Sequence, residues 1–301
     1  MGPTEAVRAS ASPDPSVRRV RARRGALTTA VLQVLLTMGA VVMVVPFYWM
    51  IVTSVREPGA AFSTASIDWW PDTFHWENYG AAIQRMAAEG MNFWRLYGNS
   101  LLVATVGTIG QVLTSSMAAY SFARLRFPGR EQLFFGYLAT MMIPGSVTLI
   151  PVFAIVRALG WVDTYWALII PGIFSPWGTF MLRQFFLSLP RELEESARID
   201  GATLWQIYTR VTLPLAKTAI ATLGTFTFMG FWGSFMWPLI VTISPSLRTL
   251  PIGLTVFTQR YSTDYSQLMA ASVMATVPII VLFLFNQRYF VESIKLQGIK
   301  G

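Results

Sequence analysis

Long stretches without any charged residue alternate along the chain with short charged segments. A helix needs about 20 predominantly apolar residues to cross the hydrocarbon core of a bilayer. Six uncharged stretches meet this requirement, one of them only narrowly: residues 25–55, 96–123, 132–156, 164–182 (the narrow case), 218–247 and 265–287. The pattern therefore predicts an all-α, polytopic membrane protein with six transmembrane helices.

The segments between the stretches complete the predicted organisation. Residues 25–55 are too long for the apolar region of a signal peptide and lack a small-residue cleavage site, so we expect a retained first span. In chain order the prediction is a disordered basic cytoplasmic arm (1–24), the first transmembrane helix (25–55), an extracytoplasmic loop with a short helix (56–95), a five-helix core (96–287) that includes a polar loop (188–214), and a cytoplasmic C-terminal tail (288–301).

The basic residues predict the orientation. If the N-terminus is inside, the cytoplasmic segments carry 17 of the 23 Lys and Arg residues. Cytoplasmic loops carry an excess of these residues, so both termini and the loop at 188–214 are expected in the cytoplasm. Six Arg residues of the N-terminal arm would then contact anionic lipid. The net charge of +8 indicates this membrane distribution rather than a nucleic-acid partner.

Prolines lie within several of the uncharged stretches. Membrane helices tolerate proline where neighbouring groups satisfy the freed carbonyls. We expect most of these prolines to be packing kinks and a minority to be hinges. They are Pro46, Pro144, Pro151, Pro171, Pro176, Pro238 and Pro278.

Composition restricts the chemistry of the chain. Only 13% of the residues are charged, against about 25% in a typical soluble domain. The chain has no Cys and a single His, His75, which excludes thiolate sites and His-pair metal sites. It contains no Gly-x-Ser-x-Gly and no phosphate-binding Gly-x-x-x-x-Gly-Lys sequence, so neither an enzyme nor an ATP-binding protein is expected. No Asp or Glu lies in a predicted span, which disfavours an ion-coupled secondary carrier.

The polar loop at 188–214 has its own helix signals. Four of the 15 acidic residues fall within nine positions there, and Glu192 and Glu194 would lie near a positive helix end. Gly201 suits a left-handed stop, and Thr203 with Gln206 forms a capping box for a second helix. The spacing predicts a short helix, a glycine turn and a second helix that continues into the membrane. An ordinary amphipathic loop is the alternative.

Several motifs resemble one family of membrane proteins. Glu195-Ser-Ala-Arg-Ile-Asp-Gly201, followed after nine residues by Val211-Thr-Leu-Pro214, resembles the EAA loop of bacterial ABC-importer permeases. Ser196 replaces an Ala of that loop and Val211 replaces an Ile. Further stretches resemble the maltose-type, binding-protein-dependent sugar permeases: Asn99-Ser100, residues 120–129, 142–145 and 189–193, Trp237-Pro-Leu239 and Gly298-Ile-Lys-Gly301.

The resemblance implies a function for the polar loop. Its first helix would be the coupling helix of a type I importer permease, held in a cleft of an ATP-binding subunit. Glu194 or Glu195 would pair with a basic residue of that subunit, while Leu193 and Ala197 fill an apolar groove. The residues expected to couple the two subunits are Leu193, Glu194, Glu195, Ser196, Ala197, Asp200, Gly201 and Pro214.

The resemblance also implies partners. They are a similar or identical permease, with a heterodimer favoured, two cytoplasmic ATP-binding subunits and an extracytoplasmic solute-binding protein. No cofactor would be bound by this chain, since ATP and Mg²⁺ belong to the partner ATPases. The assembly would lie in a bacterial cytoplasmic membrane and import a solute by alternating access. Sugars, oligosaccharides, polyols and glycerophosphodiester-type ligands all remain open.

The candidate substrate residues combine aromatic faces with polar groups. Aromatic faces suit the C–H surfaces of sugars, although aromatic residues in spans more often serve packing. Family members often have Trp-Asn-Asp/Glu-Phe where this chain has Trp232-Gly-Ser-Phe235. The loss of the amide and the carboxylate removes polar contacts expected in that family. The candidates are Trp232, Ser234, Phe235, Asn99 and Gln111.

Overall fold

The computed structural model describes residues 15–58, 69–258 and 264–298, and this part of the chain is built from helices and turns without a β-strand. The predicted all-α class is confirmed. Three helices are long and apolar enough to cross a membrane alone: α1 (Pro15–Ser54), α3 (Phe93–Arg124) and α14 (Tyr265–Gly298). Three further pairs of helices meet the criterion when each bent pair is counted as one span, which makes up to six.

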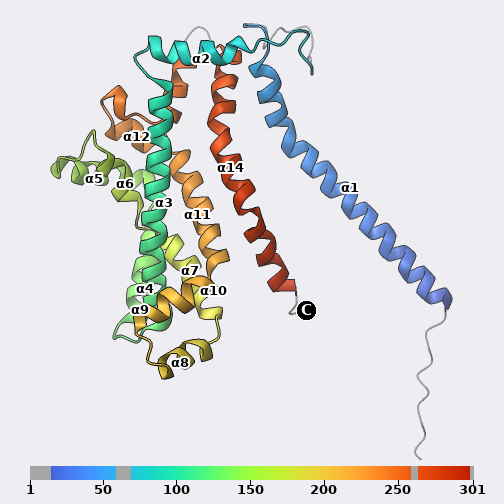
Figure 1. Cartoon of the computed structure of the whole chain (residues 1–301), viewed down its shortest axis with the longest axis vertical. Coiled ribbons are helices and arrows are strands. Elements are labelled where there is room, and N and C mark those ends of the chain that lie inside the picture. The colour runs from blue at the N-terminus through green and yellow to red at the C-terminus, as the bar shows by residue number, and fades with distance from the viewer. Residues whose placement is uncertain (1–14, 59–68, 259–263, 299–301) are drawn as a thin grey trace, which may run out of the picture.

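The three long helices share one end of the molecule, where α2 (Glu77–Ala88) lies across the bundle (Figure 1). This is the short helix expected in the loop at 56–95. Asn78 of α2 is buried and donates hydrogen bonds to the carbonyl oxygens of Ser54 and Arg56, which joins α2 to the end of α1. The described end of α14 lies toward the opposite end of the bundle, as does the start of α1 (Figure 1).

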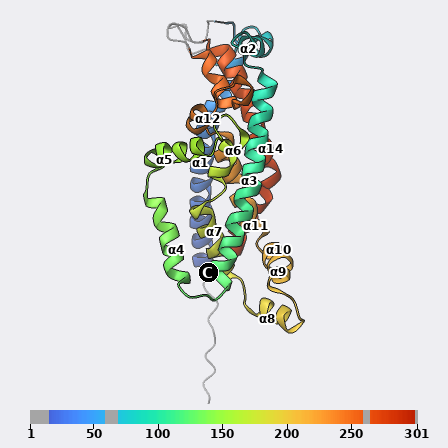
Figure 2. The ribbon, with the colours of Figure 1, turned by 90° about the vertical axis from the view of Figure 1, so that its left-hand side faces the viewer.

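The first bent pair departs most from the prediction. α4 (Arg130–Ala139) continues into the 3₁₀ turn η2 (Thr140–Met142), and α5 (Gly145–Ala158) then leaves at 102°. Ile143, which precedes Pro144, has an extended ψ of 116°. A residue before proline is disfavoured in the α region, so the helix ends there. The expected kink at Pro144 is therefore a complete break, and α5 lies across the bundle beside α12 and α6 (Figures 1 and 2).

The second bent pair turns by 42° between two helical segments. It comprises α6 (Tyr165–Ile169) with the 3₁₀ turn η3 (Ile170–Gly172), followed by α7 (Pro176–Ser188). Ser175 caps α7, because its hydroxyl accepts a hydrogen bond from the amide of Gly178. Pro176 occupies the first helical position, where its missing N–H is not needed. This proline starts a helix rather than kinking one.

The third bent pair turns by 78° at Ala216, where α11 (Lys217–Trp232) begins. Before it come α9 (Leu204–Ile207), the π-helical turn η4 (Tyr208–Thr212) and α10 (Leu213–Leu215). The prediction of one span over residues 218–247 is wrong, because α11 ends at Trp232. The chain continues as separate short elements: α12 (Met236–Val241), η5 (Pro245–Leu247), α13 (Leu250–Gly253) and η6 (Leu254–Phe257).

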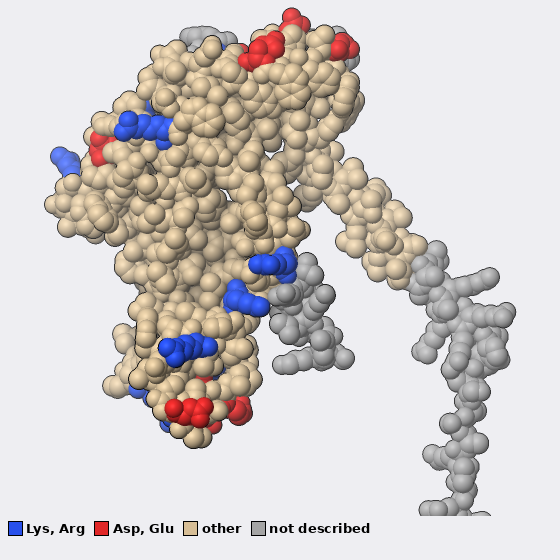
Figure 3. Space-filling model, in the orientation of Figure 1, with Lys and Arg blue, Asp and Glu red and all other residues tan. Residues whose placement is uncertain are grey.

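The core surrounds α3, against which α7 and α11 pack (Figures 1 and 2). Near α2 the buried side chains include Met86, Leu96 and Phe257. At the opposite end Phe186 and Tyr208 pack against Tyr120 of α3. By contrast, the apolar side chains of α1 are exposed over residues 28–47. Figure 3 shows that the charged residues of this face gather toward the two ends, with an uncharged band between them.

Candidate functional site

The predicted helix–turn–helix forms at the end of the molecule opposite α2 (Figure 1). α8 (Glu192–Ile199) carries three acidic residues in its first turn and Arg198 in its last, which matches the polarity of the helix dipole. Gly201 has φ +82° and reverses the chain. Thr203 and Gln206 form both hydrogen bonds of the capping box that starts α9. These local predictions are confirmed.

The inner face of α8 is tied to α3 by a buried ion pair. Nε of Arg124, the last residue of α3, lies 3.0 Å from Oε1 of Glu194, and the two side chains are 2% and 10% exposed. The hydroxyl of Thr212 in η4 also donates to Oε1 of Glu194, at 3.4 Å. Glu194 therefore has a charged partner within this chain, which leaves Glu195 as the exposed one of the two residues expected to pair with a basic residue of another subunit.

The same arginine also holds the end of α7. Nη2 of Arg124 donates to the carbonyl oxygens of Phe186 and Leu189, at 2.6 and 2.8 Å. Carbonyls in the last turn of a helix have no partner within the helix, and a cation near them is favourable. Arg124 thus joins the ends of α3 and α7 to the middle of α8.

An aromatic cluster continues this connection along α3. The rings of Tyr120 and Tyr208 lie 5.1 Å apart, and Tyr120 also packs edge-on against Phe186. The hydroxyls of Tyr208 and Ser116 are 2.7 Å apart and share a hydrogen bond. Buried side chains interdigitate closely, so a displacement of α8 would be transmitted to α3 rather than absorbed.

The outer face of α8 presents apolar and acidic side chains together. Leu193 is 44% exposed and Ile199 is 86% exposed, while Glu195 and Ser196 are also exposed and Ala197 is half-buried. The sequence analysis did not predict Ile199 as a contact residue. The only indication in the sequence is that an apolar residue stands between two charged ones, Arg198 and Asp200. Asp200 ends the helix, and Pro214 lies in α10. An exposed apolar face with an unpaired carboxylate is typical of a surface that binds another protein.

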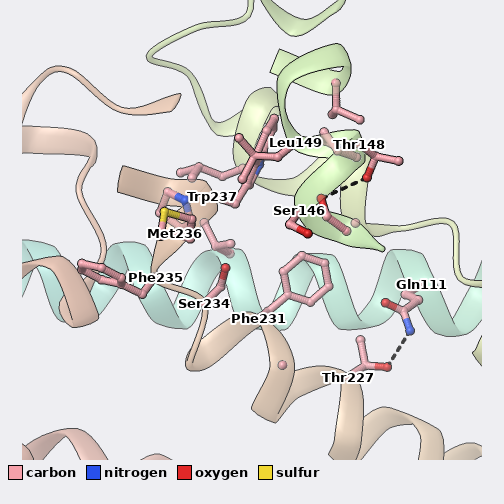
Figure 4. Close-up of a pocket in the computed structure, with 18 of the residues that line it drawn as sticks. Gln111, Ser146, Thr148, Leu149, Thr227, Phe231, Ser234, Phe235, Met236 and Trp237 are labelled. Carbon is pink, nitrogen blue, oxygen red and sulfur yellow. Dashed lines mark hydrogen bonds between the residues drawn. The ribbon is translucent and has the colours of Figure 1, made fainter. Parts of the chain in front are cut away.

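A second candidate site is a cavity of about 830 Å³ between α3, α5, α7, α11 and α12. Gln111, Ser234 and Phe235 line it, as do Ser146, Thr148, Phe231, Met236 and Trp237 (Figure 4). Nε2 of Gln111 donates to the hydroxyl of Thr227 at 2.9 Å, which links α3 to α11 at one end of the cavity. Three of the five predicted substrate residues therefore face the same space.

Trp232 and Asn99, the other two predicted substrate residues, do not line this cavity. Trp232 is 4% exposed, stacks on Phe228, and donates from Nε1 to the carbonyl of Ala275 in α14. Asn99 donates to the carbonyls of Ser246 and Arg248, and it accepts from the hydroxyl of Tyr165. Both side chains hold helices and loops together. Their polar groups are already used, so they are not available to a solute.

Glycines allow the wall of the cavity to close around Phe231. A Cβ atom at Gly107 of α3 or at Gly172 of η3 would lie 2.6 Å from Cζ of Phe231. The ring is thus wedged between two glycines and lines the cavity from a fixed position. In the sequence, Gly107 and Gly172 are isolated glycines in uncharged stretches. Nothing in their surroundings predicts that both contact Phe231. Other lining residues that the prediction missed are Ser146, Thr148, Trp177 and Trp237.

On the side of the molecule that carries α2, Asp163 joins the loop before α6 to the loop after α12. Its carboxylate accepts hydrogen bonds from the amides of Ile243 and Ser244 and from the Ser244 hydroxyl. The Ser244 hydroxyl bond is the main cause of a pKa of Asp163 below its ordinary value; partial burial opposes the shift and the two amides add to it. Asp163 has φ +63°, which Asp tolerates better than most residues.

No group of three or more metal-ligating side chains occurs in the described ranges. Three helices and three bent pairs of helices are long and apolar enough to cross a membrane, and a cavity lies between α3, α5, α7, α11 and α12. The described part of the chain therefore has the features of a polytopic membrane protein. Residues 111–295, more than half of the chain, match the family of binding-protein-dependent transport system inner membrane components, and the chain belongs to this family.

Relatives support this assignment, and a solved structure shares the fold. The chain is 36% identical over 279 residues to the arabinooligosaccharides transport system permease protein AraQ of Halalkalibacterium halodurans, covering 91% of this chain and 99% of that protein. It is 34% identical over 266 residues to the sn-glycerol-3-phosphate transport system permease protein UgpE of Brucella abortus, covering 86% and 93%. A chain of a bacterial ABC transporter for the acidic polysaccharide alginate shares the fold, with a TM-score of 0.76, 24% identity, and 89% and 98% covered.

Proposed function

We propose that this chain is the transmembrane permease subunit of an ATP-driven importer for a sugar or sugar-like solute delivered by an external binding protein. The observation that carries the proposal is α8, which presents Leu193, Glu195 and Ile199 outward while Glu194 is held inward by Arg124. A helix built in this way receives force from a partner and passes it to α3. Membership of the family and the names of its relatives support the solute class.

The motor is a pair of cytoplasmic ATP-binding subunits, which hold ATP and Mg²⁺. The apolar residues Leu193 and Ile199 enter a groove of one such subunit, and Glu195 pairs with a basic side chain beside it. A cavity of about 540 Å³ next to α8 carries both signs of charge, because Arg126, Arg191 and Arg198 line it together with Glu194 and Glu195. Both termini and α8 face the cytoplasm of a bacterial cell, in keeping with the excess of Lys and Arg at that end.

A second permease subunit completes the passage. The exposed apolar side chains of α1 and the open side of the cavity are surfaces that such a subunit would cover. The external binding protein releases its solute at the opposite end, near α2. ATP-driven closure of the motors pushes α8, Arg124 passes the movement to α3, and the cavity wall formed by Gln111 shifts. Alternation between outward and inward opening then moves the solute.

Uptake into proteoliposomes that contain the purified complex tests the proposal. Glu195→Lys reverses the exposed charge, and Gly201→Val places a β-branched side chain where φ is +82°. Each variant is expected to insert normally and to lose ATP-driven uptake. Glu195→Asp, which keeps the negative charge at the same exposed position, is the matched control and retains uptake. Uptake that needs an ion gradient and no ATP would instead identify an ion-coupled carrier and refute the proposal.

A further inference from the structure

The lining of the cavity between α3, α5, α7, α11 and α12 is uncharged. Among the described residues that form it, none is Lys, Arg, His, Asp or Glu. The uncharged stretches from which the spans arise extend this property along the membrane part of the chain. An anion that enters a space of low polarity loses several kcal/mol of hydration, which only a nearby cation or a dense set of donors restores. This chain supplies no such cation.

Aromatic rings form the largest apolar surfaces of the cavity. Trp177 and Phe226 stand edge-to-face with centroids 6.1 Å apart, on α7 and α11. Trp237 donates its indole N–H to the carbonyl of Ala167, so the ring is fixed and its N–H is already used. Phe231 is wedged between Gly107 and Gly172. Rigid ring faces pack against flat C–H surfaces at little cost in conformational entropy.

Hydroxyl and amide groups supply the polar part. Ser146 lies in the first turn of α5 and Ser234 in the segment between α11 and α12, and both line the cavity (Figure 4). No hydrogen bond joins either hydroxyl to another described residue. Gln111 uses an N–H on Thr227, which leaves its carbonyl oxygen as an acceptor. A hydroxyl donates and accepts, so these groups match the hydroxyls of a neutral ligand, whereas an acceptor such as the Gln111 carbonyl repels an anion.

The first peptide N–H groups of α5 also face this region, because Gly145 and Ser146 line the cavity. Such donors bind hydroxyl oxygens as well as anions, so they do not separate the two ligand classes. A helix end carries about half a unit of charge, less than the full charge of a carboxylate or the larger charge of a phosphate. Because the described lining contains no basic side chain, it favours a neutral ligand over an anionic one.

We propose that this cavity binds an uncharged sugar or short oligosaccharide and discriminates against phosphorylated and uronic-acid solutes. The inference rests on the proposed function and narrows its substrate class. The named relatives include permeases for a neutral oligosaccharide and for a glycerol phosphate, so similarity alone leaves both classes open. The ring faces of Trp177 and Trp237 bind sugar C–H surfaces, and Ser146, Ser234 and Gln111 bind the hydroxyls.

Protection of an introduced thiol tests this directly, since the chain contains no Cys. Ser234→Cys is placed in the full chain in lipid nanodiscs, and its labelling by a small maleimide is timed with each probe. We expect arabinotriose, a mannuronate trisaccharide and sn-glycerol 3-phosphate to differ in the concentration that slows labelling. The protecting concentration of arabinotriose should be at least about tenfold lower than that of either anion. Ser196→Cys, exposed on α8, is the control that no probe protects. Adding Ser146→Arg to Ser234→Cys should allow the uronate trisaccharide to protect.

Equal or better protection by either anion overturns the inference, as does labelling that no sugar slows. ATP-driven uptake is measured separately, in proteoliposomes that contain the complex with its ATP-binding subunits. If uptake occurs while an anion protects best, only the neutral-ligand inference fails. If no solute is taken up with ATP, the proposed function fails independently of the labelling result.

Discussion

Removal of the Glu194 carboxylate should release α8 from the rest of the protein. In Glu194→Gln the Arg124 guanidinium keeps its two carbonyl partners, Phe186 and Leu189, but loses the only carboxylate within 4 Å in the described part of the chain. The arginine side chain is 2% exposed, so water cannot readily replace the lost partner. A buried charge left in this way costs roughly 3–5 kcal/mol.

The size of this cost determines what can be measured. α8 is a short element between two turns, so the lost free energy is expected to appear as local opening rather than global unfolding. A change of roughly 3–5 kcal/mol raises the open fraction by about two to four orders of magnitude. Arg191 and Arg198 flank and end the helix and are trypsin sites. Cleavage at these residues follows the open population when opening and closing are fast.

The assay is limited trypsin digestion of the purified protein, with cleavage after Arg198 timed by mass spectrometry. Glu195→Gln is the matched control, because this neighbouring carboxylate is exposed and has no ion pair among the described residues; its effect should stay within about 0.5 kcal/mol. The double variant Arg124→Met with Glu194→Gln removes both charges and should recover part of the protection, because Met leaves the Phe186 and Leu189 carbonyls without the Arg124 donor. Equal cleavage of Glu194→Gln and Glu195→Gln would refute the buried link.

The remaining predictions concern the cavity, the reassigned residues and the outer loops. Gly172→Ala should push Phe231 into the cavity, lower the free energy of unfolding by about 1–3 kcal/mol and slow uptake. Gly230→Ala is the control, because nothing lies within 4 Å of the added Cβ, and it should change neither stability nor uptake. Uptake assays and thermal scans compare the two variants. Trp232→Phe should lower the free energy of unfolding by about 1 kcal/mol and Asn99→Ala by about 2–4 kcal/mol. Neither variant should change the solute preference, and a changed preference would show that the residue contacts the solute. Because the pKa of Asp163 is lowered by folding, its contribution is complete above the ordinary value of 3.8 and is lost as pH falls through the lower folded pKa. Asp163→Asn should abolish this acid sensitivity in melts from pH 5 to pH 2, and an unchanged profile would assign the acid loss elsewhere.

The local features of the chain were readable because short-range chemistry determines them. The turn at Gly201 and the capping box of Thr203 and Gln206 involve neighbours within a few residues, so their residue types suffice for a prediction. The long apolar spans within α1, α3 and α14 follow from length and composition alone. Apolar length cannot show whether a helix crosses the bundle or lies along it, which is why the 102° turn before α5 was missed.

The candidate site shows where sequence reasoning stops. Trp232 and Trp237 are five residues apart in an aromatic segment, yet the end of α11 places the first against α14 and the second in the cavity wall. No periodicity signals that division. Glu194 and Arg124 are 70 positions apart, so only the packing of α8 beneath α3 shows that Glu194 faces inward while Glu195 faces outward. Contacts with residues that are distant in the sequence therefore determine which of two nearby residues of the same type faces the interior.

The central claim is that α8 lies in the cytoplasm and receives the force of an ATP-binding subunit. Because the chain has no Cys, Ile199→Cys introduces a single thiol at a side chain that is 86% exposed. The decisive measurement is its labelling by a membrane-impermeant maleimide in vesicles of opposite orientation. We expect labelling only in inside-out vesicles, and loss of that labelling when the ATP-binding subunits are bound. Labelling only in right-side-out vesicles would contradict the account.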